Sequence, residues 1–151
     1  MRNPRNFVTI HALRKIKKGE IDLGQDKIMV HLLYEREILD QTAVVADKYT
    51  PNSTSITSHN FTDGQLLEGQ VFKNGVFDAQ DTLFKSIGTG LNNHRIAAIA
   101  LCHVDTDTLI AIIRSPFINK RFYFNGGDIL ITWDNDPNKI FNIKKDLEKI
   151  E

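Results

Sequence analysis

The stretch RIAAIALCHV (residues 95–104), followed closely by TLIAII (residues 108–113), decides the fold of this 151-residue chain. Both runs are apolar almost throughout, which is typical of strands that are buried on both faces. Asp105, Thr106 and Asp107 between them are tight-turn residues, because aspartate side chains bond nearby backbone amides. The two runs are therefore predicted to form an antiparallel pair at the centre of a sheet.

Shorter strand patterns lie on both sides of this pair, separated by Gly, Asn, Asp and Pro. Residues 27–33 predict a buried strand, and residues 82–87 predict another. Residues 66–77 predict a hairpin that turns at Asn74-Gly75, since Asn-Gly is the strongest short-range hairpin signal.

Residues 128–133 and 139–143 predict a last hairpin across a polar turn. Many short strands at this spacing indicate a mainly β fold. We expect an antiparallel β-sandwich, immunoglobulin-like or jelly-roll-like, with a short N-terminal helix.

The two ends of the chain are charged and weakly patterned. Residues 11–18 predict a short helix that ends at Gly19. We expect three parts, namely a basic arm with this helix (1–18), the β-sandwich domain (19–143) and a charged tail (144–151). Such ends usually fray, so the β core is expected not to need them.

Composition excludes several classes of protein. Nineteen basic and nineteen acidic residues cancel, so no global field attracts nucleic acid or an anionic membrane. No apolar run approaches the roughly 20 residues of a membrane span, and no secretory signal is recognisable. The single cysteine, Cys102, excludes an internal disulfide and favours synthesis in a reducing cytoplasm.

Two acidic stretches have metal-ligand residue types. His103 stands near Asp105 and Asp107, but turn chemistry explains these aspartates as well. The stretch DNDPN (134–138) resembles the start of a calcium loop, whose sixth and twelfth positions here hold lysine instead of glycine and glutamate. We therefore predict no metal site.

No pattern for catalysis or cofactor binding is present either. The sequence has no His-Glu-x-x-His and no Gly-x-Ser-x-Gly, and the glycines at 88–90 and 126–127 lack phosphate-loop spacing. Cys102 has apolar neighbours and is interpreted as a buried hydrophobe. We predict no catalytic residue, no cofactor and no enzymatic activity.

The C-terminal stretch FNGGDILITWDN (124–135), followed by NKIF (138–141), resembles the ending of a family of small structural proteins of tailed bacteriophages. In that family a Gly-Gly-Asp turn enters an I-x-I-x-W strand, and I-F-x-L closes the domain; Ile143 here replaces the final leucine. The resemblance covers residues 19–33 and about 66–143.

This resemblance implies a role on the virion, as a capsid decoration or head auxiliary protein or as a tail component, and implies no chemistry. The expected partners are a major capsid or tail protein and further copies of the chain, with no membrane and no sequence-specific nucleic acid. The expected location is the virion, after synthesis in the host cytoplasm.

Two groups of residues are candidates for contacts with a partner. One is basic and the other is aromatic, although the aromatic side chains would equally complete the domain's own core. The candidates are Arg2, Arg5, Arg14, Lys15, Lys17, Lys18, Phe117, Phe122, Tyr123 and Phe124.

Two other functions stay open. One is a sandwich that binds carbohydrate or a host surface, with Trp133 as a stacking platform, although Ile129, Ile131 and Trp133 share one strand face and suggest a core tryptophan. The other is a small hydrolase that uses His103 and Asp105.

Overall fold

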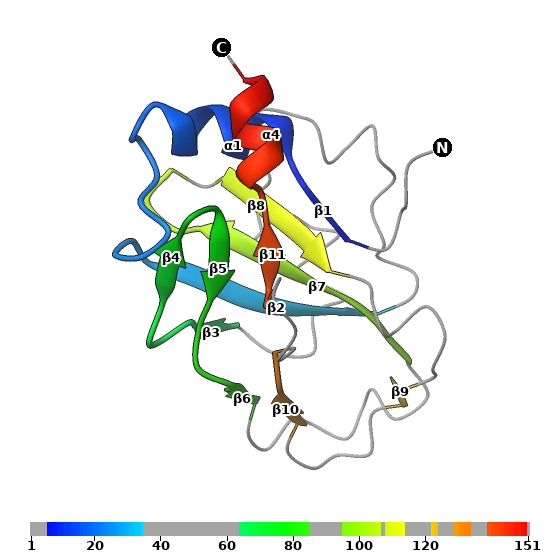
Figure 1. The fold of residues 1–151 in the computed structure, drawn as a ribbon. Coiled ribbons are helices and arrows are strands. Elements are labelled where there is room, and N and C mark those ends of the chain that lie inside the picture. The colour runs from blue at the N-terminus through cyan, green and yellow to red at the C-terminus, as the bar shows by residue number, and fades with distance from the viewer. Residues whose placement is uncertain are drawn as a thin grey trace.

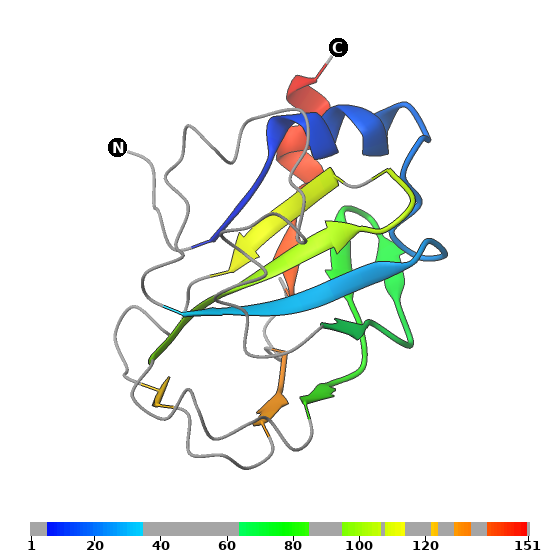
Figure 2. The ribbon, with the colours of Figure 1, turned by 180° about the vertical axis from the view of Figure 1, so that it is seen from behind.

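The computed structural model describes residues 6–34, 64–84, 95–106, 108–113, 122–123, 129–133 and 139–150. Its main sheet is antiparallel, with strand order β1-β8-β7-β2-β3, and β9 pairs with one end of β7 (Figures 1 and 2). The strands are β1 (Asn6–Val8), β2 (Ile28–Tyr34), β3 (Gln65–Leu66), β7 (Arg95–His103), β8 (Thr108–Ile113) and β9 (Phe122–Tyr123).

The predicted central pair is confirmed. β7 and β8 pair antiparallel from Ile99↔Ile113 to His103↔Thr108, with a register shift after Leu101. All six residues of β8 are buried. On β7, Ile99 and Leu101 face the main core, and the intervening Ala100 is buried on the other side. This explains the nearly continuous apolar sequence, because both faces of the pair are covered.

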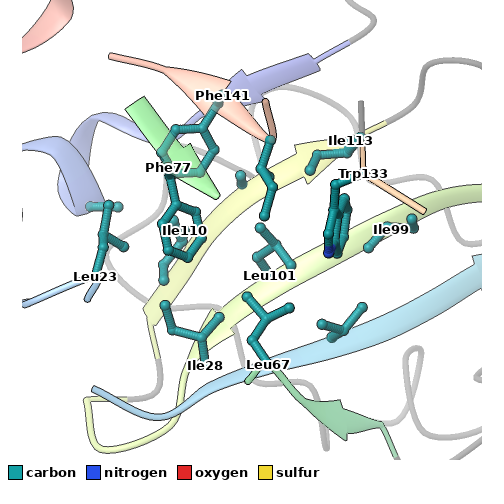
Figure 3. Packing of buried hydrophobic residues seen from close by; sticks show 14 of the residues in the cluster. Leu23, Ile28, Leu67, Phe77, Ile99, Leu101, Ile110, Ile113, Trp133 and Phe141 are labelled. Carbon is teal, nitrogen blue, oxygen red and sulfur yellow. The ribbon is translucent and has the colours of Figure 1, made fainter. Parts of the chain in front are cut away.

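Two small antiparallel sheets cover one face of the main sheet. The first has the order β11-β5-β4, and the second pairs β10 with β6. Phe77 and Phe141 project from the first small sheet towards Leu101 and Ile110, with Trp133 beside them (Figure 3). The strands are β4 (Val71–Lys73), β5 (Val76–Asp78), β6 (Thr82–Phe84), β10 (Ile129–Ile131) and β11 (Phe141–Asn142).

The predicted hairpin is confirmed as β4–β5. Its turn residues Asn74 and Gly75 have φ of 54° and 83°, as a type I′ turn requires. A Cβ on Gly75 would lie 2.6 Å from the backbone nitrogen of Lys144, so glycine is needed for packing as well as for conformation.

The predicted last hairpin is wrong. β10 pairs with β6 through Ile129↔Phe84, and β11 pairs with β5 through Phe141↔Phe77. The alternation of apolar residues correctly places Ile131 and Trp133 in the core. Such alternation specifies which face is buried and does not specify which strand is the neighbour.

The N-terminal segment is not a detached arm. β1 forms an edge of the main sheet by pairing with β8, and helix α1 (Ile10–Lys17) follows at once. Thr9 caps this helix by accepting a 3.2 Å bond from the Ala12 amide, and its hydroxyl donates to the Leu109 carbonyl at 2.7 Å. Ala12 and Leu13 belong to the core, so the expectation that the core does not need residues 1–18 does not hold for the described part.

The C-terminal segment is also packed on the core. Helix α4 (Lys144–Lys149) begins after Ile143, which is 1% exposed. Leu147 and Ile150 pack against the core cluster. The mainly β, antiparallel fold with a short N-terminal helix is therefore confirmed, and both ends of the described chain contribute to it. No helix in the described ranges is long and apolar enough to cross a membrane.

Candidate functional site

A chain of polar side chains lies at the end of the main sheet where β7 turns into β8. His103 is 2% exposed, and its Nε2 lies 2.9 Å from Oδ2 of Asp26. Its Nδ1 lies 2.7 Å from Oγ1 of Thr106, and that oxygen lies 2.8 Å from Oγ1 of Thr108. These four residues form one continuous network of buried and half-buried polar side chains.

The backbone indicates which imidazole nitrogen carries hydrogen. The Thr106 amide donates to Nδ1 of His103 at 3.3 Å, so Nδ1 offers a lone pair. Nε2 then donates to the Asp26 carboxylate, and the Thr106 hydroxyl donates to Nδ1. Both ring nitrogens are therefore satisfied within the protein.

The carboxylate of Asp26 has a second donor. The backbone amide of Asp22 lies 2.9 Å from the same oxygen. This bond, followed by the bond from His103, lowers the pKa of Asp26 below its ordinary value, because both stabilise the charged form. Asp26 therefore remains ionised as an acceptor at neutral pH.

This network links the loop before β2 to the turn between β7 and β8, which are far apart in sequence. Asp26 precedes β2, whereas His103 is the last residue of β7 and Thr106 lies in the β7–β8 turn. Gln70 strengthens the same corner, since its side-chain amide donates to the carbonyls of Leu23 at 2.6 Å and Asp26 at 3.0 Å. These hydrogen bonds hold the loop before β2 against the β7–β8 turn.

The sequence pattern drew attention to His103 and to the aspartates of the adjacent turn, but not to Asp26. Asp105 is exposed, and Asp107 lies outside the described residues. Antiparallel pairing of Ile28 with His103 brings Asp26 alongside instead. Recognising the β2–β7 pairing would have revealed this contact. Within the described ranges, no group of three or more His, Cys, Asp and Glu side chains is arranged to hold a metal.

The described basic candidates lie on or directly after α1, which contacts α4. Arg14 and Lys18 are exposed, and Lys15 lies 4.0 Å from the Glu20 carboxylate. Lys17 is exposed, but its ammonium donates to the carbonyls of Leu147, at 2.6 Å, and Ile150. Lys17 therefore caps α4 and is not a simple surface charge. Arg2 and Arg5 lie outside the described residues.

The aromatic candidates are described only in part. Phe122 and Tyr123 form β9, whose backbone pairs with β7, and Phe117 and Phe124 lie outside the described residues. Trp133 is 8% exposed, and its indole N–H donates to the Gln80 carbonyl at 3.1 Å. Trp133 is thus a core residue, as its strand pattern predicts, and its ring face is not open for stacking on a sugar.

An exposed apolar pair lies on the β6–β10 sheet. Leu83 and Leu130 are direct cross-strand partners and are 39% and 58% exposed. Their strand neighbours Phe84 and Ile131 are buried, so the sheet has one apolar inner face and an apolar pair on its outer face. No sequence pattern identified this pair, because an exposed and a buried leucine look alike until the face is known.

Comparisons with known proteins found no matching family model, no matching curated protein and no matching solved structure.

Proposed function

We propose that this protein is a structural component of a tailed-phage virion, a capsid-associated decoration or head auxiliary protein that acts through protein–protein contacts. The observation that carries the proposal is the sequence resemblance at residues 124–141, with its Gly-Gly-Asp turn, I-x-I-x-W strand and I-F closure. A tail or connector component is the closest alternative, since the same resemblance includes tail proteins.

Two structural features support a contact function. The described N- and C-terminal segments pack on the core, so the domain can present its surface to a partner in a fixed arrangement. Leu83 and Leu130 also give its surface an apolar pair of the kind that interfaces bury. Repetition on a particle makes individually weak contacts of this kind sufficient for attachment.

The two other functions have less support. A glycan-binding sandwich was expected to use Trp133, which is buried here. A hydrolase was expected to use His103 with Asp105, whereas His103 bonds Asp26 and Thr106 and is buried.

The decisive experiment starts from a phage whose genome carries this gene. Its particles are purified on a density gradient, and their proteins are identified by peptide mass spectrometry. Peptides of this protein should co-migrate with intact particles. Leu130→Lys should reduce attachment while leaving the thermal midpoint unchanged. Binding on a glycan array or turnover of a model ester, with no protein on the particles, would replace the proposal with one of the other two functions.

A further inference from the structure

The β4–β5 turn carries an asparagine–glycine pair that can be modified by water alone. Asn74 is exposed, and Gly75 follows it. Glycine has no side chain to hinder its own nitrogen, so that nitrogen can attack the Cγ of a preceding asparagine. Ammonia then leaves and a five-membered succinimide ring forms. Water opens this ring at one carbonyl to give aspartate, or at the other to give isoaspartate, in which the main chain runs through Cβ and Cγ.

The closed turn prevents this reaction. Asn74 and Gly75 have φ of 54° and 83°, as in a type I′ turn. The first central residue of such a turn has a ψ of about +30°. At this ψ, the Cβ of Asn74 lies nearly opposite the Gly75 nitrogen across the Cα–C bond. A five-membered ring needs these two atoms on the same side of that bond, so the reaction requires the turn to open.

The same turn is an attachment point for the C-terminal segment. β11 pairs with β5, and α4 follows β11 directly (Figure 1). The Ile143 amide donates to the Gly75 carbonyl at 2.8 Å, immediately before α4 begins. Gly75 is buried, and a Cβ on it would lie 2.6 Å from the backbone nitrogen of Lys144. Gly75 therefore has little room to move while Lys144 stays in place.

The two products of deamidation differ in what they do to this contact. Aspartate keeps the length of the main chain, and Asp-Gly is itself a favoured type I′ pair. Isoaspartate adds one carbon atom to the main chain before Gly75. Lys73 and Val76 are paired across the two-residue turn, so the added atom has to displace Gly75 from Ile143 and Lys144.

We propose that Asn74 is a modification site that deamidates through opening of the β4–β5 turn. Its isoaspartyl product then prevents the turn from closing and detaches the start of α4 from Gly75. The step is irreversible because ammonia is lost to the solvent, so the detached form accumulates as the protein ages. The reaction needs only water, so this inference stands or falls independently of the virion assignment.

The first measurement is the rate of deamidation at Asn74 in the purified full-length chain at mildly alkaline pH. Peptide mapping by mass spectrometry detects the conversion of amide to acid, and chromatography separates the aspartyl and isoaspartyl peptides. Mapping also distinguishes Asn74 from Asn125, which precedes a glycine too and lies outside the described residues.

Deamidation at Asn74 should be at least about tenfold slower in the folded protein than in guanidinium chloride, because only the open fraction of the folded protein reacts. Equal rates in the two conditions would overturn the protection by the turn. If the folded protein kept the Asn74 amide for as long as the preparation stayed intact, Asn74 would not be a modification site.

The second measurement is hydrogen exchange in protein aged to a known isoaspartate content. Exchange of the α4 amides should become faster in the isoaspartyl fraction, whereas the β8 amides should stay protected. Asn74→Gly is the matched control, because Gly-Gly also suits a type I′ turn and has no amide to lose. After the same ageing, its α4 amides should exchange as they do in the fresh variant.

Asn74→Asp, measured fresh, controls for the new negative charge, because it has the aspartyl side chain on a main chain of normal length. Its α4 amides should exchange at the rate of the unaltered protein. If exchange were faster in this fresh variant, charge and not the added main-chain atom would explain the effect, and the proposal would fail. Unchanged exchange of α4 in the isoaspartyl fraction would equally contradict the detachment.

Discussion

The β7–β8 pair and the α1–α4 layer both contribute buried residues to the same core, but they differ in how many of their residues are buried. In β8 every residue is buried, so its burial is visible in the sequence as a run of apolar letters. In α1, Ala12 and Leu13 are the buried residues among eight, and the rest of the helix is mostly charged or exposed. A charged segment can thus be as firmly part of a fold as an apolar one, through a few buried residues and specific backbone bonds.

Ile110→Asp should have the largest effect in this comparison, since Ile110 is fully buried at the centre of β8. An unpaired buried carboxylate costs several kcal/mol, which is comparable to the whole stability of a domain. The variant should be insoluble or lack a cooperative melt by circular dichroism. Leu130→Asp is the matched control on an exposed strand position and should fold with a nearly unchanged midpoint.

Leu13→Ala tests whether α1 is part of the core. Leu13 is buried within the core cluster, so its truncation should lower the free energy of unfolding by about 2–3 kcal/mol. Urea denaturation measures this loss. Arg14→Ala changes the exposed neighbour and should cost no more than about 0.5 kcal/mol. If the two variants were equally stable, Leu13 would not contribute to the core, and α1 would be a detached arm.

Asp26→Asn tests the network at the β7–β8 turn and should cost about 1 kcal/mol at pH 7, because a charged acceptor becomes neutral. The lowered pKa of Asp26 in the folded state means that its carboxylate stabilises the fold above about pH 4. This stabilisation is lost as the pH falls through the lowered pKa. Acid titration of stability should therefore be shallower in Asp26→Asn than in the unaltered protein, and parallel curves would refute the assignment.

Lys17→Met should have the smallest effect, about 0.5 kcal/mol, because Lys17 is exposed although it bonds two carbonyls of α4. The effect should be local. Hydrogen exchange should become faster in α4 amides, whereas β8 amides should stay protected. Lys18→Met, one residue away, should leave exchange in α4 unchanged, and identical exchange in both variants would remove the capping role of Lys17.

The sequence predicted the parts of this fold that have a local signature. The apolar continuity of residues 108–113 and the Asn74-Gly75 turn identified their elements correctly. The pairing of β10 with β6 and of β11 with β5 was missed, because alternation is the same whichever strand lies alongside.

The contacts of the candidate site had no local signature. Asp26 meets His103 across 77 positions of sequence, and Lys17 reaches Leu147 across 130. Both contacts depend on how distant elements pack, so residue types and spacing were insufficient to find them. Trp133 was assigned to the core correctly because its face could be read from neighbours on the same strand.

We propose that this protein acts by binding to other virion proteins. The most direct measurement is its copy number per gradient-purified particle, by quantitative mass spectrometry against the major capsid protein. We expect a fixed ratio that persists through successive gradients and falls for Leu130→Lys. A protein that stays in the soluble fraction of the lysate, with no peptides in purified particles, would contradict it.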